Sequence, residues 1–375
     1  MNEENKNVVV IKKENEETAE LMQKVFKMLG GLEDIIKPDY KVLIKPNFVA
    51  PFEKATTDID ILREVVREVK RLGAKPFIGE SSGFEFSTEA TFKILGIDKM
   101  AAEEGVQLIN FDEQEYVGIK VNDFAIKQFL VPKIVLESDC IINLPKLKGQ
   151  ALTKVTFGIK NLFGIIHRNT RRKIHAFNLE KGIYKLYEII KPQLTIVDGL
   201  WMLSKAVYSN ADYKGIIVAG KDVRLVDYVC CSIYGIGYQD VKHIKMALDE
   251  TLINSINLIS CNYDLARIAG QLSVKAKLSY IKHNFVYRCV YVTDLLISRI
   301  TGRDTIIPNF HLLFGLRPDI NKEICNKCGV CRQICPIDCI SEKYEINYEK
   351  CKYVRCMKCK NSCPIEAIKI KGFHK

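Results

Sequence analysis

The 375-residue sequence has no uninterrupted apolar run of the roughly 18 residues that a membrane-spanning helix needs. Its start, MNEENKNVVV, lacks the basic and then apolar profile of a secretory signal. The chain also contains no low-complexity tract. We therefore expect a soluble globular protein without a membrane span, located in the cytoplasm.

Two common phosphate-binding loops are missing as well. The sequence contains no GK[ST] of the Walker type. Gly235-Ile236-Gly237 follows a predicted helix rather than a strand and lacks the third glycine of a dinucleotide fingerprint. Neither loop can therefore be the basis of function here.

Cysteine, by contrast, is abundant, and nine of the fourteen cysteines lie between Cys325 and Cys363. The run from Ile324 to Pro336 has the spacing C-x2-C-x2-C-x3-C-P, which bacterial ferredoxins use to hold cubane iron–sulfur clusters. Three thiolates two residues apart wrap one cluster within a tight loop, and the fourth is directed to the other cluster. This motif predicts iron–sulfur binding.

The cysteine motif is repeated at an offset of 28 residues, because Cys356, Cys359 and Cys363 correspond to Cys328, Cys331 and Cys335. The repeat predicts two 4Fe-4S clusters. One would take Cys325, Cys328, Cys331 and Cys363, and the other Cys335, Cys351, Cys356 and Cys359.

Two cysteines depart from the repeat. Cys351 is separated from Cys356 by four residues instead of two, so its half holds either a full cluster on a longer loop or a depleted three-cysteine site. Cys339 stands where Ala367 stands in the second half, which favours a small buried residue over a ninth ligand.

The rest of the chain alternates between β-branched runs and amphipathic segments. Strands are predicted at 8–11, 42–44, 76–78, 106–111, 141–143, 194–197 and 216–219, and helices at 17–29, 59–72, 154–163, 183–190 and 222–233. This order indicates an α/β domain with a mostly parallel sheet flanked by helices. We expect this domain at 1–318, with a helical connecting region at about 252–318, and a small α+β ferredoxin-like 2x4Fe-4S domain at 319–375.

Polar side chains follow several of these strands, and the carboxyl ends of parallel strands are where α/β sheets bind ligands. Lysines and amides there can bind a small carboxylate or phosphate, and a carboxylate can act on a proton or a metal. Solvated surface charge and an ordinary turn at Asp198-Gly199 remain alternatives. The candidate residues are Lys45, Asn47, Glu80, Lys146, Lys148, Lys160, Asn161 and Asp198.

Four segments taken together, VLIKPNF, GESSG, NLPKLKG…IKNLFGIIHR and TIVDG, resemble the domain-of-unknown-function family 362 (DUF362). Many members of that family carry a C-terminal pair of 4Fe-4S clusters, so the resemblance covers essentially the whole chain. It implies an architecture rather than a reaction, because the family has no settled activity. Gly149-Gln150 replaces the family's usual Thr-His, and Met202 leads into LSKAVYSN where the family has a glycine-rich run.

Three functions compete. In the first, the clusters relay electrons between a redox partner and a site in the α/β domain, as in a ferredoxin-coupled oxidoreductase, and Lys327, Lys352 and Lys358 tune the potential or dock the partner. In the second, the protein is a non-catalytic electron carrier or a binding and assembly partner. The third is nucleic-acid binding through residues 141–191, which hold eleven Lys or Arg against two Glu; the lack of a reading motif disfavours it.

Overall fold

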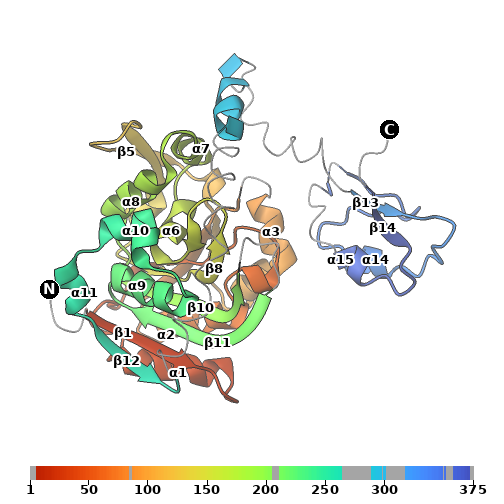
Figure 1. The fold of residues 1–375 in the computed structure, drawn as a ribbon. Coiled ribbons are helices and arrows are strands. Elements are labelled where there is room, and N and C mark those ends of the chain that lie inside the picture. Colours follow the sequence, from red (N-terminus) through yellow and green to blue (C-terminus); the bar gives the residue numbers. More distant parts are fainter. Residues whose placement is uncertain are drawn as a thin grey trace.

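The structure is a computed structural model that describes residues 6–83, 87–204, 211–263, 289–297, 299–300, 317–348, 350–351 and 358–371. A large α/β domain carries the N-terminal residues, and a small cysteine-rich unit follows near the C-terminus (Figure 1). Within these residues, no helix is long and apolar enough to cross a membrane.

A mixed sheet, with ten strands among the described residues, forms the centre of the α/β domain. Eight strands lie side by side in the order β12 (Asn257–Cys261), β1 (Asn7–Lys12), β11 (Ala211–Gly220), β10 (Leu194–Leu203), β7 (Cys140–Asn143), β2 (Lys41–Lys45), β3 (Lys75–Glu80) and β4 (Gln107–Asn110). Of these eight, β11 alone runs antiparallel to its neighbours. The predicted mostly parallel sheet is confirmed.

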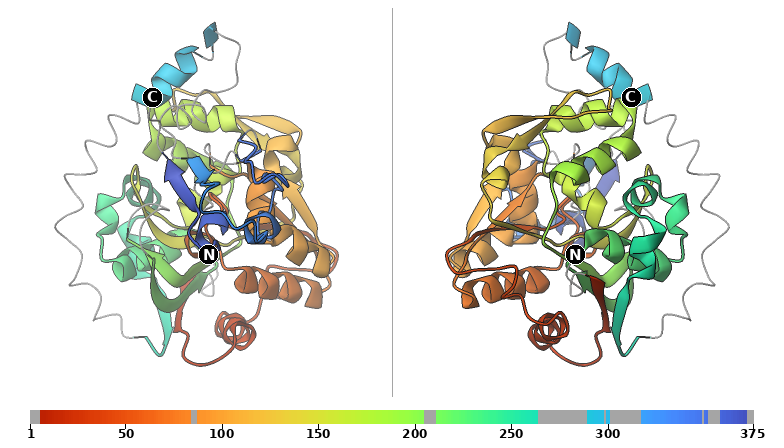
Figure 2. Two further views of the ribbon diagram at one scale, coloured as in Figure 1. Left: turned by 90° about the vertical axis from the view of Figure 1, so that its right-hand side faces the viewer. Right: turned by 90° about the vertical axis from the view of Figure 1, so that its left-hand side faces the viewer.

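Helices cover both faces of the sheet, which is why its strands are apolar on both sides. In β1, Val9 and Ile11 pack into the core on one face, whereas Val8 and Val10 pack into the core on the other. The first face is covered by α1 (Thr18–Met28), α2 (Ile59–Arg71), α3 (Thr88–Leu95) and α4 (Ile97–Glu103). The second is covered by α6 (Gly158–Asn161), α7 (Arg168–Phe177), α8 (Leu179–Ile189), α9 (Val223–Tyr234) and α10 (Lys242–Ala247). Figure 2 shows the three layers from two further sides.

A hairpin that the sequence did not suggest covers part of the second face. Strands β5 (Tyr116–Lys120) and β6 (Gln128–Pro132) pair antiparallel, and Phe129 and Val131 of β6 are fully buried in the core there. The short helix α5 (Lys133–Leu136) follows directly and leads into β7.

The helix predicted at 154–163 is wrong in its first part. β8 (Lys146–Gln150) and β9 (Lys154–Thr156) form a hairpin beside β10, and α6 begins only at Gly158. Lys154 has a positive φ of 66°, and the β-branched Val155 and Thr156 favour a strand. Gln150 completes the turn, because its Oε1 accepts hydrogen bonds from the backbone N–H groups of Leu152 and Thr153 at 2.6 and 2.8 Å.

The expected helical connection at about 252–318 is also wrong in part. After α11 (Glu250–Asn254), residues Asn257–Cys261 form β12, which pairs parallel with β1 at the edge of the sheet. A helix is present at 289–297, and residues 264–288 and 301–316 lie outside the described part of the chain. The connection therefore begins with a strand of the large domain.

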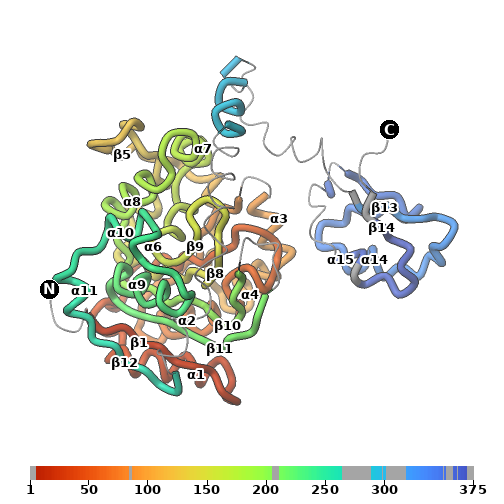
Figure 3. The backbone as a smooth tube through the Cα atoms, in the orientation of Figure 1, coloured from red at the N-terminus to blue at the C-terminus, as the bar shows by residue number. Residues whose placement is uncertain are grey.

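The small unit has α+β structure, with β13 (Arg317–Ile320) and β14 (Ile368–Lys371) paired antiparallel. Its helices α14 (Val330–Gln333) and α15 (Lys358–Asn361) begin 28 residues apart, as the sequence repeat predicts. The core is small and consists largely of cysteine and isoleucine side chains. β13 includes the residues at which we place the domain boundary. The tube in Figure 3 shows β13 and β14, the first and last strands of this unit, side by side.

Candidate functional site

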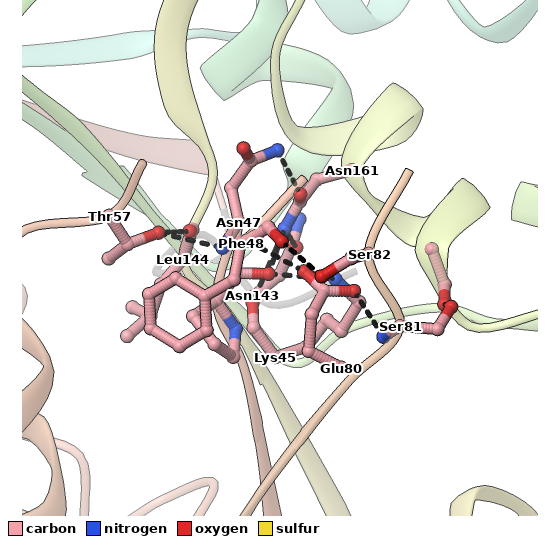
Figure 4. A network of polar contacts seen from close by, with 12 residues as sticks. Lys45, Asn47, Phe48, Thr57, Glu80, Ser81, Ser82, Asn143, Leu144 and Asn161 are labelled. Carbon is pink, nitrogen blue, oxygen red and sulfur yellow. Dashed lines mark hydrogen bonds and ion pairs between the residues drawn. The ribbon is translucent and has the colours of Figure 1, made fainter. Parts of the chain in front are cut away.

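The carboxyl ends of three adjacent parallel strands bring polar side chains together inside the α/β domain. Lys45 ends β2, Glu80 ends β3 and Asn143 ends β7, and β2 pairs with both neighbours. The amino group of Lys45 donates to Glu80 Oε2 at 2.8 Å and to the Pro46 carbonyl at 2.7 Å. Figure 4 shows this network, in which these three side chains are at most 2% exposed.

The Glu80 carboxylate is fixed by the backbone as well as by Lys45. Oε2 accepts a hydrogen bond from the Phe48 N–H at 2.9 Å, and Oε1 accepts one from the Ser81 N–H at 2.8 Å. A Cβ at Gly164 would lie 2.5 Å from Glu80 Oε1, so glycine is needed for this close approach. Burial lowers the pKa of Lys45, and the adjacent Glu80 opposes that shift.

Three asparagine side chains continue the network. Asn47 donates to Asn161 Oδ1 at 2.8 Å, Asn161 donates to Asn143 Oδ1 at 2.8 Å, and Asn143 donates to the Gly158 carbonyl at 2.9 Å. Asn143 was not among the predicted residues, although its place at the end of a predicted strand was a usable signal. These amides link the loop after β2 to α6 and to the end of β7.

Two lysines of β8 reach the same region in different ways. Lys148 donates to Asn47 Oδ1 at 2.7 Å and to the Ala55 carbonyl at 2.6 Å. Burial lowers the pKa of Lys148 well below its ordinary value, and the charges of Lys146 and Lys160 add to this effect. Lys146 instead forms an ion pair with Asp198 Oδ2 at 2.7 Å.

Asp198 does more than pair with Lys146. Oδ2 also accepts a hydrogen bond from the Asp58 N–H at 2.8 Å, and Oδ1 accepts one from the Leu200 N–H at 2.9 Å. Asp198 is therefore a buried, hydrogen-bonded carboxylate that ties β10 to the start of α2, rather than part of an exposed turn. The alternative of an ordinary surface turn at Asp198-Gly199 is not what the structure shows.

Lys160 differs from the other seven predicted residues, which are at most 5% exposed, because it is only half-buried. Its amino group lies 5.0 Å from the centroid of the Phe163 ring. Burial lowers the pKa of Lys160 to about 8; Glu180 opposes this shift and Arg171 adds to it. Of the eight residues, Lys160 is thus the only one that is not fully buried.

Asp227 of α9 positions the helix that carries Lys160 and Asn161. Its carboxylate accepts hydrogen bonds from the N–H groups of Gly158 at 2.6 Å and Ile159 at 2.9 Å. Burial raises the pKa of Asp227 to about 7, although these two N–H groups favour the charged form. The network therefore depends on a buried carboxyl group behind α6.

The small unit contains a cavity next to four of the predicted cluster cysteines. Its lining includes Cys325, Cys328, Cys331 and Cys363, the set that the spacing assigns to one cluster. Within the described residues, no group of His, Cys, Asp or Glu is arranged for a single metal ion. A cubane binds each thiolate at a separate iron and so holds its ligands farther apart than a single ion does. The donor set, four cysteines around one cavity, fits an iron–sulfur cluster.

The second set of cysteines lies in the core of the same unit. Cys351 is one of the buried core residues, Cys335 and Cys359 are partly buried and pack against it, and Cys356 lies outside the described residues. The two halves share one backbone feature, because the Ala367 N–H donates to Cys363 Sγ at 3.3 Å and the Cys339 N–H donates to Cys335 Sγ at 3.4 Å. Cys339 is 4% exposed.

The basic residues of the stretch 141–191 are only partly at the surface. Lys146, Lys148, Arg171 and Arg172 are at most 4% exposed. Of its eleven basic residues, only Lys173 and Lys191 are fully exposed, and the other five are half-buried. The four buried side chains can therefore take no part in a basic surface for nucleic acid.

The fold and these sites define a class of protein in which an α/β domain with polar strand ends is joined to a small cysteine-rich unit of ferredoxin type. Residues 42–232 match the family described as "Domain of unknown function (DUF362)". The chain belongs to this DUF362 family.

Individual relatives cover different parts of the chain. Thylakoid-associated protein sll1697 of Synechocystis sp. is 26% identical over 242 residues, which are 61% of this chain and 74% of that protein. Pyruvate synthase subunit PorD of Methanothermobacter marburgensis is 39% identical over 54 residues, 14% of this chain and 64% of the subunit. The lactate racemase apoprotein of Thermoanaerobacterium thermosaccharolyticum is 14% identical with a TM-score of 0.40 over 61% of this chain and 58% of its own length. The chain thus matches less than two thirds of the last two proteins.

Proposed function

We propose that this DUF362 protein binds two 4Fe-4S clusters and relays electrons between a redox partner and a small anionic substrate in the α/β domain. The observation that carries the proposal is the cavity lined by Cys325, Cys328, Cys331 and Cys363. The similarity of the small unit to a pyruvate synthase subunit supports an iron–sulfur electron carrier with a protein partner. When bound, the clusters would supply single-electron transfer at a potential that the surrounding hydrogen bonds adjust.

Each cluster would be held by three cysteines of one half of the repeat and by a fourth from the other half. Cys325, Cys328, Cys331 and Cys363 would bind the first, and Cys335, Cys351, Cys356 and Cys359 the second. The N–H groups of Ala367 and Cys339 would stabilise the thiolates of Cys363 and Cys335, since each donates to the sulfur.

On the side of the α/β domain, Lys160 would make the first contact with the substrate. It is half-buried, and a pKa of about 8 leaves it mostly protonated at neutral pH and able to bind a carboxylate or a phosphate. The Lys45–Glu80 pair and the asparagines behind it would keep α6 and the loop after β2 in place. The other predicted residues are buried, so they would hold α6 and this loop in place rather than contact the substrate from solvent.

A test follows from reoxidation of the loaded protein. The protein is reduced with dithionite without oxygen, and the cluster absorbance is followed while small carboxylates and phosphate esters are added one at a time. Only a compound that can itself be reduced can take up the cluster electrons, and we expect at least one such compound to accelerate reoxidation several-fold in the wild type and in the exposed control Lys173→Met, and to have little effect in Lys160→Met. An acceleration that survives in Lys160→Met would refute the assignment of the site.

The second candidate is a carrier or assembly partner without catalysis. It is favoured by the closure of the polar network, in which seven of the eight predicted residues are nearly inaccessible and hydrogen-bonded to one another or to the backbone. Such a network also stabilises a fold without binding any ligand. If no compound changes the reoxidation rate, this second function replaces the first.

A further inference from the structure

The two halves of the cysteine unit are related by the sequence repeat, but they do not have the same surroundings. Ile337, which follows Cys335-Pro336, packs against an apolar cluster of the α/β domain that contains Ala50, Ala90 and Ile94. Val49 and Phe52 pack against the same cluster. Figure 1 shows the small unit on the side of the large domain where α3 lies.

A charged contact lies next to this apolar one. The amino group of Lys358 on α15 donates to the Ile94 carbonyl at 2.7 Å. Ile94 is in the last turn of α3, where the helix leaves its carbonyl groups without partners and carries a partial negative charge. The same amino group lies 3.8 Å from Glu53 Oε1. Lys358, which we expected to tune the potential or dock an external partner, thus contacts its own chain.

The repeat makes these contacts specific to one half. The position that matches Lys358 is Val330, which carries no charge, and both Val330 and Ile365, the counterpart of Ile337, line the cavity next to Cys363. The half with Cys335, Cys351 and Cys359 therefore carries both the apolar contact of Ile337 and the charged contact of Lys358, on the side that faces α3.

The surface that Ile337 and Lys358 contact is formed by α3 and by the connection between β2 and α2. The outer side of this connection presents Phe52 and Glu53, whereas its inner side holds the polar network through Asn47 and the Ala55 carbonyl, both bonded to Lys148. The connection is firmly held, because the Asn47 N–H donates to Thr57 Oγ1 at 2.7 Å and the Gly83 N–H donates to the Val49 carbonyl at 2.9 Å.

We infer that Ile337 and Lys358 form a specific interface that holds the Cys335–Cys351–Cys359 half of the cysteine unit against α3 and residues 46–58, the connection that also carries the network. The interface identifies this half as the one facing the α/β domain and the Cys325–Cys328–Cys363 half as the one left for an external partner. That division of roles rests on the proposed function, whereas the interface itself does not.

Carbodiimide cross-linking of the full, cluster-loaded chain tests the interface. The reagent joins a carboxylate to an amine only where the two are in contact, so peptide mass spectrometry should find an amide between Glu53 and Lys358. Lys358→Glu abolishes this link, whereas Lys360→Glu, an exposed substitution on the same helix, leaves it unchanged. Links from Lys322 or Lys327 to the α/β domain in place of the Glu53–Lys358 link would overturn the inference.

A second variant tests the apolar contact of Ile337. Ile337→Asp should lower the yield of the Glu53–Lys358 link several-fold and increase amide hydrogen exchange in residues 50–56. Ile334→Asp, at a side chain 40% exposed on the same unit, should change neither. Iron per chain is measured in every variant, so that loss of clusters is not mistaken for loss of contact. An unchanged link in Ile337→Asp contradicts the inference.

The outcome is independent of the test of the proposed function. A Glu53–Lys358 link in a protein whose reoxidation responds to no compound would leave the interface standing and remove the substrate site. A protein whose reoxidation responds to a compound but that lacks the Glu53–Lys358 link would leave the substrate site standing and refute the interface.

Discussion

Lys148 donates a 2.7 Å hydrogen bond to Asn47 Oδ1 and forms no ion pair with any carboxylate in the described part of the chain. A lysine that is 2% exposed and bonded only to neutral oxygens is costly to keep charged. Because of this cost, the pKa of Lys148 is lowered well below 10.5. This relationship sets a pH dependence for the stability of the α/β domain.

Lys148→Met should remove part of that pH dependence. Between the lowered native pKa and about 10.4, the unfolded chain binds more protons than the native protein at this position, so the stability of the wild type rises with pH. The difference in urea midpoint between wild type and Lys148→Met should therefore increase towards pH 10. The fluorescence of Trp201, the single tryptophan, reports unfolding of β10. Lys173→Met, at an exposed lysine, should show a pH-independent difference; a flat difference for Lys148→Met would contradict the account.

Asp227 should act on stability in the opposite direction. Its native pKa of about 7 lies above the unfolded value of about 3.9, so the native protein binds the extra proton between these values and loses stability as the pH rises through them. Three pKa units correspond to on the order of 4 kcal/mol. Urea unfolding of Asp227→Asn should lack this loss, and we expect the variant to gain stability relative to the wild type from pH 4 to pH 7. A constant difference over that range would argue against a protonated Asp227.

The Lys146–Asp198 pair should be strongly coupled. Asp198→Asn leaves a buried ammonium group without its counter-charge, and breaking a buried pair in this way costs about 3–5 kcal/mol. The double variant Lys146→Met/Asp198→Asn should be less destabilised than the sum of the two single variants, as a urea double-mutant cycle would show. Asp39→Asn, which breaks the exposed Lys75–Asp39 pair, should change the midpoint little. Additive effects at Lys146 and Asp198 would show that the pair is not coupled.

Cys351 and Cys339 are neighbours in the core of the cysteine unit but should differ in their effect on iron binding. Cys351→Ala removes a predicted ligand and should lower the iron content from about eight to about four per chain. Cys339→Ala places the residue that the other half has at Ala367 and should leave the iron content unchanged. Iron and acid-labile sulfide assays after anaerobic purification measure both. Full iron in Cys351→Ala would show that Cys351 is not a ligand. Loss of iron in Cys339→Ala would show that Cys339 is one.

The fold could be predicted where the signal was local. β1, β2, β3 and β7 were predicted because short continuous apolar runs mark strands buried on both faces. β12 was missed because it is formed by pairing with a strand some 250 residues earlier in the chain, as in Asn7 with Asn257, and its own side chains are mostly half-buried or exposed. The sequence predicted a helix at Lys154–Thr156. The backbone of Lys154 is left-handed and turns the chain into β9, but a lysine in the sequence does not indicate such a conformation.

The site could be predicted in part for the same reason. Lys45 and Glu80 come just after the strands predicted at 42–44 and 76–78, and they approach each other because these strands are parallel neighbours in the sheet. The contacts of Lys146 and Lys148 could not be predicted, because they depend on β8, which pairs with β10 outside the regular order. The burial of nearly all these residues was also not visible in a sequence where each is an ordinary polar side chain.

The central claim is that the cysteine unit holds two clusters. The measurement that tests it most directly is iron and acid-labile sulfide per chain, together with low-temperature EPR of the dithionite-reduced protein, after anaerobic purification. We expect about eight irons, about eight sulfides and the signals of two magnetically coupled clusters. About four irons with the signal of a single cluster would contradict it and would leave the half with Cys351 without a role in electron relay.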